Sequence, residues 1–237
     1  KYLSWCIFIR RRKGDFIMHL VIINASPRVK TKSNTARIIR SFLRGFEVHG
    51  NTAEVWHLSD KKQWKSAKEA YEKNSNILFA VPLYVENIPG IMLEFLETLE
   101  PKKEAGTKMS FILQGGFAEA SQLRCGEAYL EILPSYFNCE YNGTLIKGDN
   151  FGSAWVPEKM AEKMVAHYEK MGKSFAKKRI FVKEEVNEFA APEYFSEKHN
   201  NESLYRITDG CSTCDDRCDG FLNLHSISIL YTIRRLF

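Results

Sequence analysis

Five short apolar runs, each separated from the next by a segment of helical periodicity, are the feature that most constrains this 237-residue chain. The first and third runs are almost continuously apolar, which is typical of strands covered on both faces of a sheet. The five expected strands are His19 to Ala25, Thr52 to Leu58, Asn76 to Leu83, Lys108 to Gln114 and Tyr141 to Ile146. Buried strands that alternate with helices predict a parallel sheet with helices on both faces.

The segments between these runs place apolar residues at the spacing of amphipathic helices. In the first of them, Ile38, Phe42 and Phe46 fall on one face, while Arg40 and Arg44 fall outward. The expected helices are Asn34 to Phe46, Trp64 to Lys73, Gly90 to Leu99, Glu119 to Phe137 (ended or kinked at Pro134) and Pro157 to about Lys178. Because crossovers between parallel strands are right-handed, five such strands favour the order 2-1-3-4-5 in an α/β three-layer sandwich.

One domain suffices for a chain of this length, and we assign it to residues 18–179, where strands and helices alternate. Residues 1–17 are interpreted as an N-terminal extension. In them an apolar run precedes the basic cluster Arg10 to Lys13, the reverse of the order in a secretory signal. A membrane-surface or partner-binding arm is the alternative. Over residues 180–237 the pattern dissolves, so we expect an irregular C-terminal tail.

The formal net charge is +5, but five basic residues against one acidic residue before residue 18 account for +4 of it. The remaining body is close to neutral and lacks the basic face that nucleic-acid binding requires. The last apolar stretch, Ile227 to Ile233, is far shorter than the ~20 residues of a membrane-spanning helix. Six cysteines are too few for a disulfide scaffold. We therefore expect a soluble cytoplasmic protein with no membrane span and no nucleic-acid partner.

A ligand site is expected where the strand order reverses, at the carboxyl ends of the first and third strands. The loop after the first strand, residues 26–35, offers hydroxyl groups, the guanidinium of Arg28 and the positive end of a helix, which together suit a phosphate monoester. The sequence contains neither a nucleotide-triphosphate P-loop nor G-x-G-x-x-G. A serine-rich helix cap without a ligand is the alternative interpretation.

Two further loops are expected at the same edge. The segment P-L-Y-V-E-N-I-P-G after the third strand contains Pro82 and the flat ring of Tyr84, and its backbone could edge-bond a planar heterocycle. Gly115 and Gly116 follow the fourth strand and allow the backbone to approach a ligand closely. Each of these loops, taken alone, is equally consistent with a plain turn.

The order and spacing of these motifs resemble the NAD(P)H-dependent FMN reductase branch of the flavodoxin-like superfamily. The resemblance spans about residues 18–178 and rests on A-S-P-R followed by S-N-T, on P-x-Y-x-x-x-x-P-G, and on the glycine pair. It implies FMN as the cofactor, NAD(P)H as the electron donor and a homodimer. The resemblance assigns FMN binding to Ser26, Arg28, Ser33, Asn34 and Thr35 for the phosphate, to Pro82, Leu83, Tyr84 and Asn87 for one edge of the isoalloxazine, and to Gln114, Gly115, Gly116 and Phe117 for the other edge.

The function implied by the resemblance is an oxidoreductase that passes hydride from NAD(P)H through FMN to an acceptor such as a quinone, a flavin, a nitroaromatic or a metal ion. No catalytic side chain is assigned, because the cofactor carries the chemistry. One alternative is an electron carrier of the flavodoxin or iron–sulfur flavoprotein type, although a near-neutral body argues against the acidic kind. A flavin-free interaction protein that retains the fold is the other alternative.

Cys211, Cys214 and Cys218 form a C-x-x-C-x-x-x-C cluster in the tail. A closed zinc or iron–sulfur site requires four ligands. The fourth would have to come from Cys6, Cys125, Cys139 or His225. Iron–sulfur flavoproteins, a related branch, carry a compact cysteine cluster before the third strand, whereas residues 59–76 of this chain contain no cysteine. We therefore expect free thiols rather than a metal site.

Overall fold

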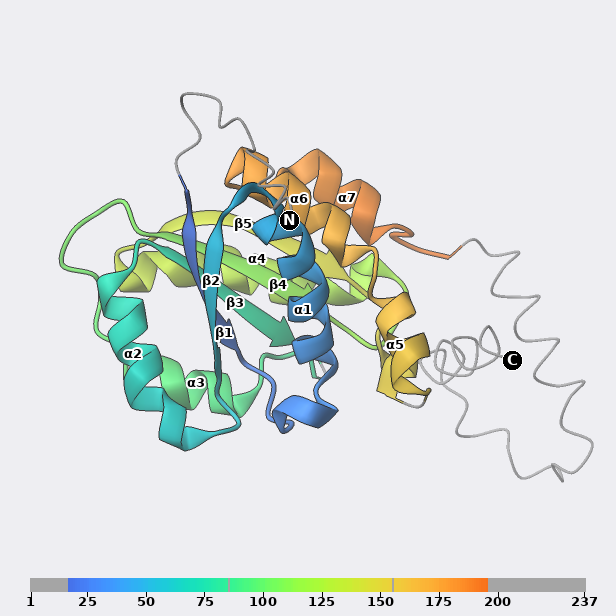
Figure 1. The fold of residues 1–237 in the computed structure, drawn as a ribbon, viewed down its shortest axis with the longest axis horizontal. Coiled ribbons are helices and arrows are strands. Elements are labelled where there is room, and N and C mark those ends of the chain that lie inside the picture. The colour runs from blue at the N-terminus through green and yellow to red at the C-terminus, as the bar shows by residue number, and fades with distance from the viewer. Residues whose placement is uncertain (1–16, 85, 155, 196–237) are drawn as a thin grey trace, which may run out of the picture.

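The computed structural model describes residues 17–84, 86–154 and 156–195. Within them the chain forms a five-stranded sheet in the order β2-β1-β3-β4-β5, and every neighbouring pair of strands is parallel (Figure 1). The strands are β1 His19–Asn24, β2 Thr52–His57, β3 Asn76–Pro82, β4 Lys108–Gln114 and β5 Glu140–Lys147. The predicted α/β sandwich and its strand order are therefore confirmed.

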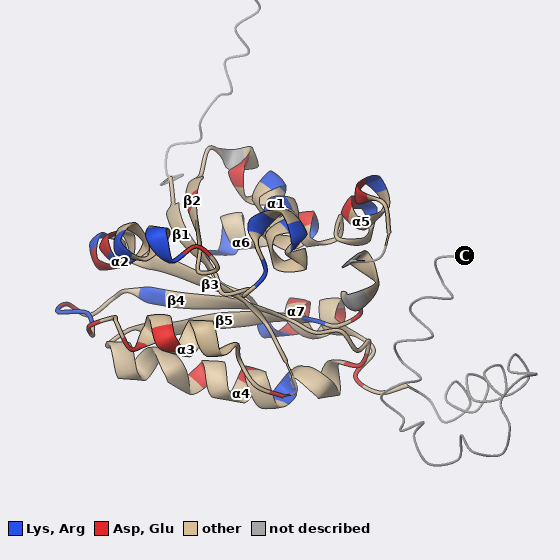
Figure 2. Ribbon diagram, turned by 90° about the horizontal axis from the view of Figure 1, so that it is seen from below, with Lys and Arg blue, Asp and Glu red and all other residues tan. Residues whose placement is uncertain are grey.

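Helices cover both faces of the sheet. The α-helices of the described segments are α1 Asn34–Phe46, α2 Trp64–Lys73, α3 Gly90–Leu96, α4 Arg124–Ile132, α5 Glu158–Met164, α6 Tyr168–Lys178 and α7 Lys183–Ala190. α1 and α6 lie on one face, and α3 and α4 lie on the opposite face (Figures 1 and 2). None of the helices in the described segments is long and apolar enough to cross a membrane.

Two predicted elements differ from the structure. The single helix expected from Pro157 to Lys178 is divided into α5 and α6. Each half has its own anchor, because Glu158 of α5 forms an ion pair with Arg37 of α1, and Tyr168 of α6 is buried with its hydroxyl near Asn150. The expectation of an irregular chain from residue 180 onward is wrong at α7, an eight-residue helix. Its buried residues are only Val186 and Ala190, so its periodic signal in the sequence is weak.

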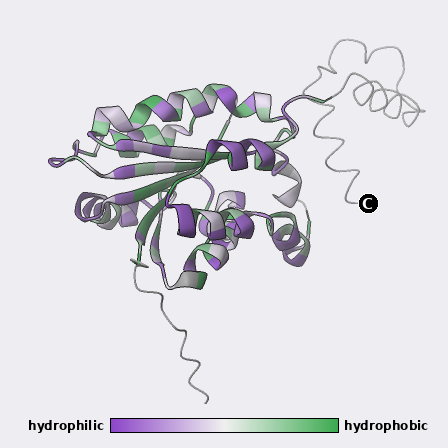
Figure 3. Cartoon of the chain, turned by 90° about the horizontal axis from the view of Figure 1, so that it is seen from above, coloured by the Kyte–Doolittle hydropathy of each residue, from purple (hydrophilic) through white to green (hydrophobic). Residues whose placement is uncertain are grey.

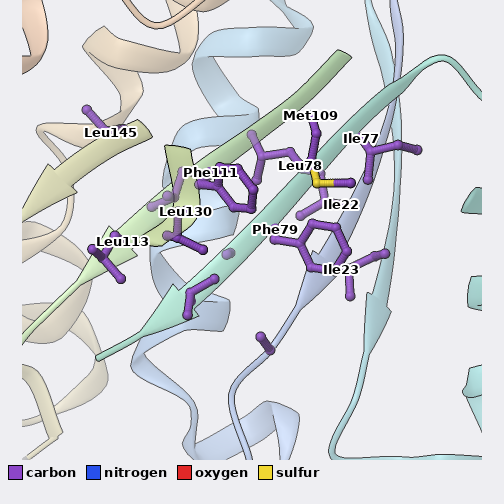
Figure 4. Packing of buried hydrophobic residues seen from close by; sticks show 14 of the residues in the cluster. Ile22, Ile23, Ile77, Leu78, Phe79, Met109, Phe111, Leu113, Leu130 and Leu145 are labelled. Atoms are coloured by element: carbon purple, nitrogen blue, oxygen red, sulfur yellow. The ribbon is translucent and has the colours of Figure 1, made fainter. Parts of the chain in front are cut away.

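The core lies between the sheet and the two helix layers, where the strands carry hydrophobic stretches (Figure 3). Side chains of neighbouring strands stack across the sheet, as the ring of Phe79 does on that of Phe111 at a centroid distance of 6.1 Å (Figure 4). Both rings are fully buried. This continuous burial explains why the strands are recognisable as apolar runs.

The contact between α1 and α6 depends on two glycines. A Cβ atom added to Gly172 of α6 would lie 2.0 Å from the carbonyl oxygen of Phe42, and one added to Gly45 of α1 would lie 2.0 Å from the carbonyl oxygen of Glu169. The two helix backbones are therefore in direct contact at this crossing. α6 is thereby held against α1, the helix whose N-terminus faces the candidate site.

We predict that Gly172→Ala destabilises the fold by about 2 kcal/mol, because the added methyl group forces the two backbones apart. Gly90→Ala is the matched control, since a Cβ at the start of α3 would meet no atom within 4 Å. We expect this control to leave stability unchanged or slightly raised, by less than about 1 kcal/mol. Urea denaturation followed by circular dichroism measures both. Equal midpoints for the two variants would contradict the close helix crossing.

Candidate functional site

The loop between β1 and α1 is organised by the side chains of two buried serines. Ser26 accepts a hydrogen bond at Oγ from the backbone N–H of Arg28 at 3.2 Å, which folds the start of the loop into a tight turn. Ser33 is the N-cap of α1 and accepts at Oγ from the backbone N–H of Ala36 at 3.2 Å. The two hydroxyl groups therefore fix both ends of this loop.

The N-terminus of α1 presents free donors. The cap by Ser33 serves the third N–H of the helix, and within the described residues the N–H groups of Asn34 and Thr35 have no hydrogen-bond acceptor. Arg28, Lys30 and Lys32 are exposed on the same loop, and no carboxylate in the described part of the chain forms an ion pair with them. Helix-end donors and surplus positive charge are the groups with which proteins bind anions, so this loop is the candidate anion site.

The three loops predicted to meet do lie together. Thr35 at the start of α1 accepts at Oγ1 from the side-chain amide of Gln114 at 3.4 Å, across the end of β3. The backbone N–H of Leu83 donates to the carbonyl of Gln114 at 2.8 Å. Register pairing places Pro82 opposite Gln114. The segments that follow β1, β3 and β4 therefore lie side by side at this edge of the sheet.

The loop after β3 makes a tight turn that leaves the ring of Tyr84 accessible. Tyr84 and Asn87 exchange backbone hydrogen bonds at 2.9 and 3.0 Å, and Glu86 between them has a positive φ of 64°. Tyr84 is 43% exposed. The side-chain oxygen of Asn87 instead accepts from the N–H of Ile88 at 2.8 Å. Tyr84 can therefore offer a ring to a ligand, whereas one polar atom of Asn87 is already occupied.

The predicted set omitted a fourth loop, residues 147–150 after β5. Lys147 accepts at its carbonyl from the N–H of Gly115, and the N–H of Asn150 donates to the carbonyl of Gly115, at 3.2 and 3.1 Å. A Cβ at Gly148 would lie 1.9 Å from the carbonyl oxygen of Phe117, so only glycine fits there. The glycine in Lys-Gly-Asp-Asn is the sequence signal that could have revealed this loop. These contacts fix the glycine pair after β4.

Asn34 has a different role from the one expected. Its side-chain amide donates to the carbonyl of Asn150 at 2.9 Å, and its side-chain oxygen accepts from Arg37 at 2.8 Å. The side chain therefore joins α1 to the fourth loop instead of pointing to a ligand. The group of Asn34 that can still bind an anion is its backbone N–H.

A buried polar pair lies beneath the Ser26 loop. Asn24 accepts at Oδ1 from the N–H of Ser26 at 3.0 Å, and its amide nitrogen lies 3.0 Å from Nδ1 of His57 at the end of β2. Burial lowers the pKa of His57 below its usual value, and the nearby charge of Lys30 lowers it further. A neutral ring with an unprotonated Nδ1 is the form that can accept from the Asn24 amide.

A cavity of about 670 Å³ lies at the opposite edge of the sheet, between the end of α2 and residues 100–107. Lys102 in its wall donates from Nζ to the carbonyls of Glu72 and Asn74 at 3.1 and 2.8 Å. The ammonium group therefore caps the last turn of α2. None of the residues predicted for the site lines this cavity, and we place the candidate site at the carboxyl edge.

The cysteine cluster Cys211–Cys218 lies outside the described residues. Within them, no group of three or more histidine, cysteine, aspartate or glutamate side chains has the arrangement of a metal site. The cysteines of this part are Cys125, which is exposed, and Cys139, which is half-buried.

Comparison with solved structures identifies this fold in oxidoreductases. One similar structure is an FMN-dependent NADH-azoreductase from Bacillus anthracis in complex with FMN, with a TM-score of 0.50 and 15% identity, covering 67% of this chain and 99% of that protein. Another is the NAD(P)H:quinone oxidoreductase from Methanothermobacter marburgensis, with a TM-score of 0.52 and 14% identity, covering 68% and 100%. No protein-family profile and no curated protein sequence matches the chain. The fold is therefore that of the flavodoxin-like α/β proteins.

We predict that Ser33→Ala destabilises the protein by about 1 kcal/mol, because it removes the N-cap of α1. Ser41 on the same helix is the matched control, since its hydroxyl is buried and has no partner in the described part of the structure. Ser41→Ala should be neutral or stabilising, because it removes an unsatisfied polar atom. Thermal unfolding of both variants tests this. A larger loss at Ser41 than at Ser33 would show that the cap does not stabilise α1.

Proposed function

We propose that this protein is an FMN-dependent oxidoreductase that takes reducing equivalents from NAD(P)H and passes them to an acceptor such as a quinone or an azo compound. The observation that carries the proposal is the anion site at the N-terminus of α1. There the free N–H groups of Asn34 and Thr35, the hydroxyls of Ser26 and Ser33 and the surplus cations face the switch point of the sheet.

The residues around this loop suit FMN, which has a phosphate and a planar ring, better than an inorganic anion. Beside the anion site lie the exposed Tyr84 and the backbone of Gly115 and Gly116. An aromatic side chain can pack against a planar ring, and a glycine backbone lets such a ring approach closely. We assign the phosphate to Ser26, Arg28, Ser33 and Thr35 with the backbone of Asn34. We assign the isoalloxazine edges to Pro82, Leu83, Tyr84 and Asn87 on one side, and to Gln114, Gly115, Gly116 and Phe117 on the other.

When bound, FMN supplies the ring that accepts and returns hydride, so the chain itself has to bind, orient and shield it. The backbone of the loops after β3 and β4 orients the ring edges, because both loops are held by hydrogen bonds to neighbouring strands and loops. The azoreductase and the quinone oxidoreductase with the same fold support an azo compound or a quinone as the acceptor. No side chain is required as a general acid or base for this transfer.

We infer that the protein works as a homodimer in the cytoplasm. Tyr129 and Ile132 of α4 are 43% and 59% exposed, and Tyr136 of the 3-10 helix η5 (Leu133–Phe137) that follows α4 is 72% exposed. Such a group of large apolar side chains is typical of a surface that a partner covers. A second copy of the chain is the partner that we propose.

The test is a visible spectrum of the purified full-length protein after addition of FMN, and then of NADPH or NADH without oxygen. We expect flavin bands that bleach with the nucleotide, followed by turnover when a quinone is added. A protein that takes up no FMN would contradict the proposal. Bleaching without turnover of any acceptor would instead identify an electron carrier.

Arg28→Gln tests the phosphate end of the site. We predict that it weakens FMN binding about fivefold, because an exposed charge-assisted contact contributes about 1 kcal/mol. Lys103→Gln, which removes an equal charge at the opposite edge of the sheet, is the control and should leave the dissociation constant unchanged. Quenching of FMN fluorescence on binding measures both. Equal effects of the two variants would indicate that only net charge matters.

A further inference from the structure

A short segment after α7, residues 191–195, lies against the loop that follows β4, and we call it the strap. The N–H of Ala120 donates to the carbonyl of Pro192 at 2.9 Å, and the N–H of Ser121 donates to the carbonyl of Glu193 at 3.2 Å. These are the first N–H groups of the 3-10 helix η4 (Ala120–Leu123), whose N-cap residue makes no side-chain cap. Carbonyls of the strap therefore cap η4 from outside.

Arg124 holds the strap in this position. Its Nε donates to Oε1 of Glu193 at 3.1 Å and its Nη2 donates to Oε2 of the same carboxylate at 2.7 Å, in a two-point contact. Its Nη1 donates to Glu127 of α4 at 2.6 Å, and Nη2 also donates to Asn187 of α7 at 3.2 Å. One guanidinium thus ties the strap, α4 and α7 together.

The strap has further attachments on both sides of the Arg124 contact. The N–H of Phe195 donates to the carboxylate of Glu119 at 2.7 Å, and the ammonium of Lys147 donates to the carbonyl of Ala191 at 3.0 Å. Glu119 lies in the loop after β4, and Lys147 is the last residue of β5, so both partners lie at the carboxyl edge of the sheet. Hydrogen bonding to Arg124 lowers the pKa of Glu193 below its usual value, so the contact is an ion pair at neutral pH.

η4 in turn packs against the candidate flavin site. A Cβ at Gly115 would lie 2.7 Å from Cδ2 of Leu123, so the last residue of η4 rests directly on the first glycine of the pair. Leu123 is 1% exposed and belongs to the hydrophobic core, so neighbouring core side chains enclose it. A displacement of η4 is therefore transmitted to the backbone that forms one isoalloxazine wall.

We propose that Arg124 is a positioning residue of the flavin site. Through Glu193 it fixes the strap, and the strap in turn caps η4. Leu123 of η4 then determines the position of the Gly115 backbone, which we assign to the isoalloxazine edge. This inference rests on the proposed function. The positioning role of Arg124 differs from a purely stabilising one. Most exposed ion pairs contribute little to stability, whereas the pair of Arg124 and Glu193 holds the carbonyls that cap η4 beside the site.

The test compares Glu193→Gln with Glu185→Gln. Glu185 is a matched control, since it too forms an ion pair, with Lys178 at 2.9 Å, but this pair joins α7 to α6 away from the strap. In the apo protein we expect faster hydrogen exchange of residues 115–123 in Glu193→Gln and unchanged exchange there in Glu185→Gln. In the FMN-loaded protein we expect a shifted flavin absorption band and a dissociation constant raised about fivefold for Glu193→Gln alone, as about 1 kcal/mol of lost coupling would give.

Arg124→Lys completes the series, because lysine keeps the charge but cannot form the two-point contact. It should give the same spectral shift as Glu193→Gln. Unchanged exchange of residues 115–123 and an unchanged flavin band in Glu193→Gln, in a wild type that binds FMN, would overturn the positioning role and leave the proposed function intact. A wild type that takes up no FMN would overturn both.

Discussion

The pairing of β1 with β2 on one side and with β3 on the other is the interaction on which the candidate site depends. It places Asn24 opposite both His57 and Ala80, so β1 and β2 end at the same level and β3 continues beyond them to Pro82. The side chain of Asn24 then holds the N–H of Ser26 and contacts His57. A shift of the strand register by one residue would turn the Asn24 side chain to the other face of the sheet. The Ser26 loop would then lose the hydrogen bond that holds its first residue.

The strands and the first helices could be predicted because their signals are local. β3 is buried on both faces and is therefore a run of apolar residues. The apolar face of α1 begins directly after its N-cap residue, Ser33. The break between α5 and α6 could not be predicted, since it follows from contacts of Glu158 with α1 and of Tyr168 with the loop after β5. A contact between residues that are distant in sequence produces no periodic pattern in either segment.

The same distinction applies within the site. The serines of the first loop and the glycines after β4 are types of residue that anion and ring binding require, and their positions after strands were sufficient to nominate them. The engagement of the Asn34 side chain could not be predicted, because its partner Asn150 is 116 positions away. The loop at 147–150 and the strap were missed for that reason too. Both segments make contacts through backbone N–H and carbonyl groups. Because nearly every residue carries these groups, such contacts leave no signal in the sequence.

The residue pattern alone establishes five parallel strands, the order in which they lie and a loop suited to phosphate. It does so because burial and helix capping act over a few neighbouring residues. Tertiary contacts select which of the suitable groups are free. They engage the side chains of Asn34 and Asn87 within the chain and bring residues 191–195 against the glycine loop. Among the residues that the structure describes, they leave the N–H groups of Asn34 and Thr35 without an acceptor. Each of these outcomes follows from hydrogen bonds whose partners only folding brings together.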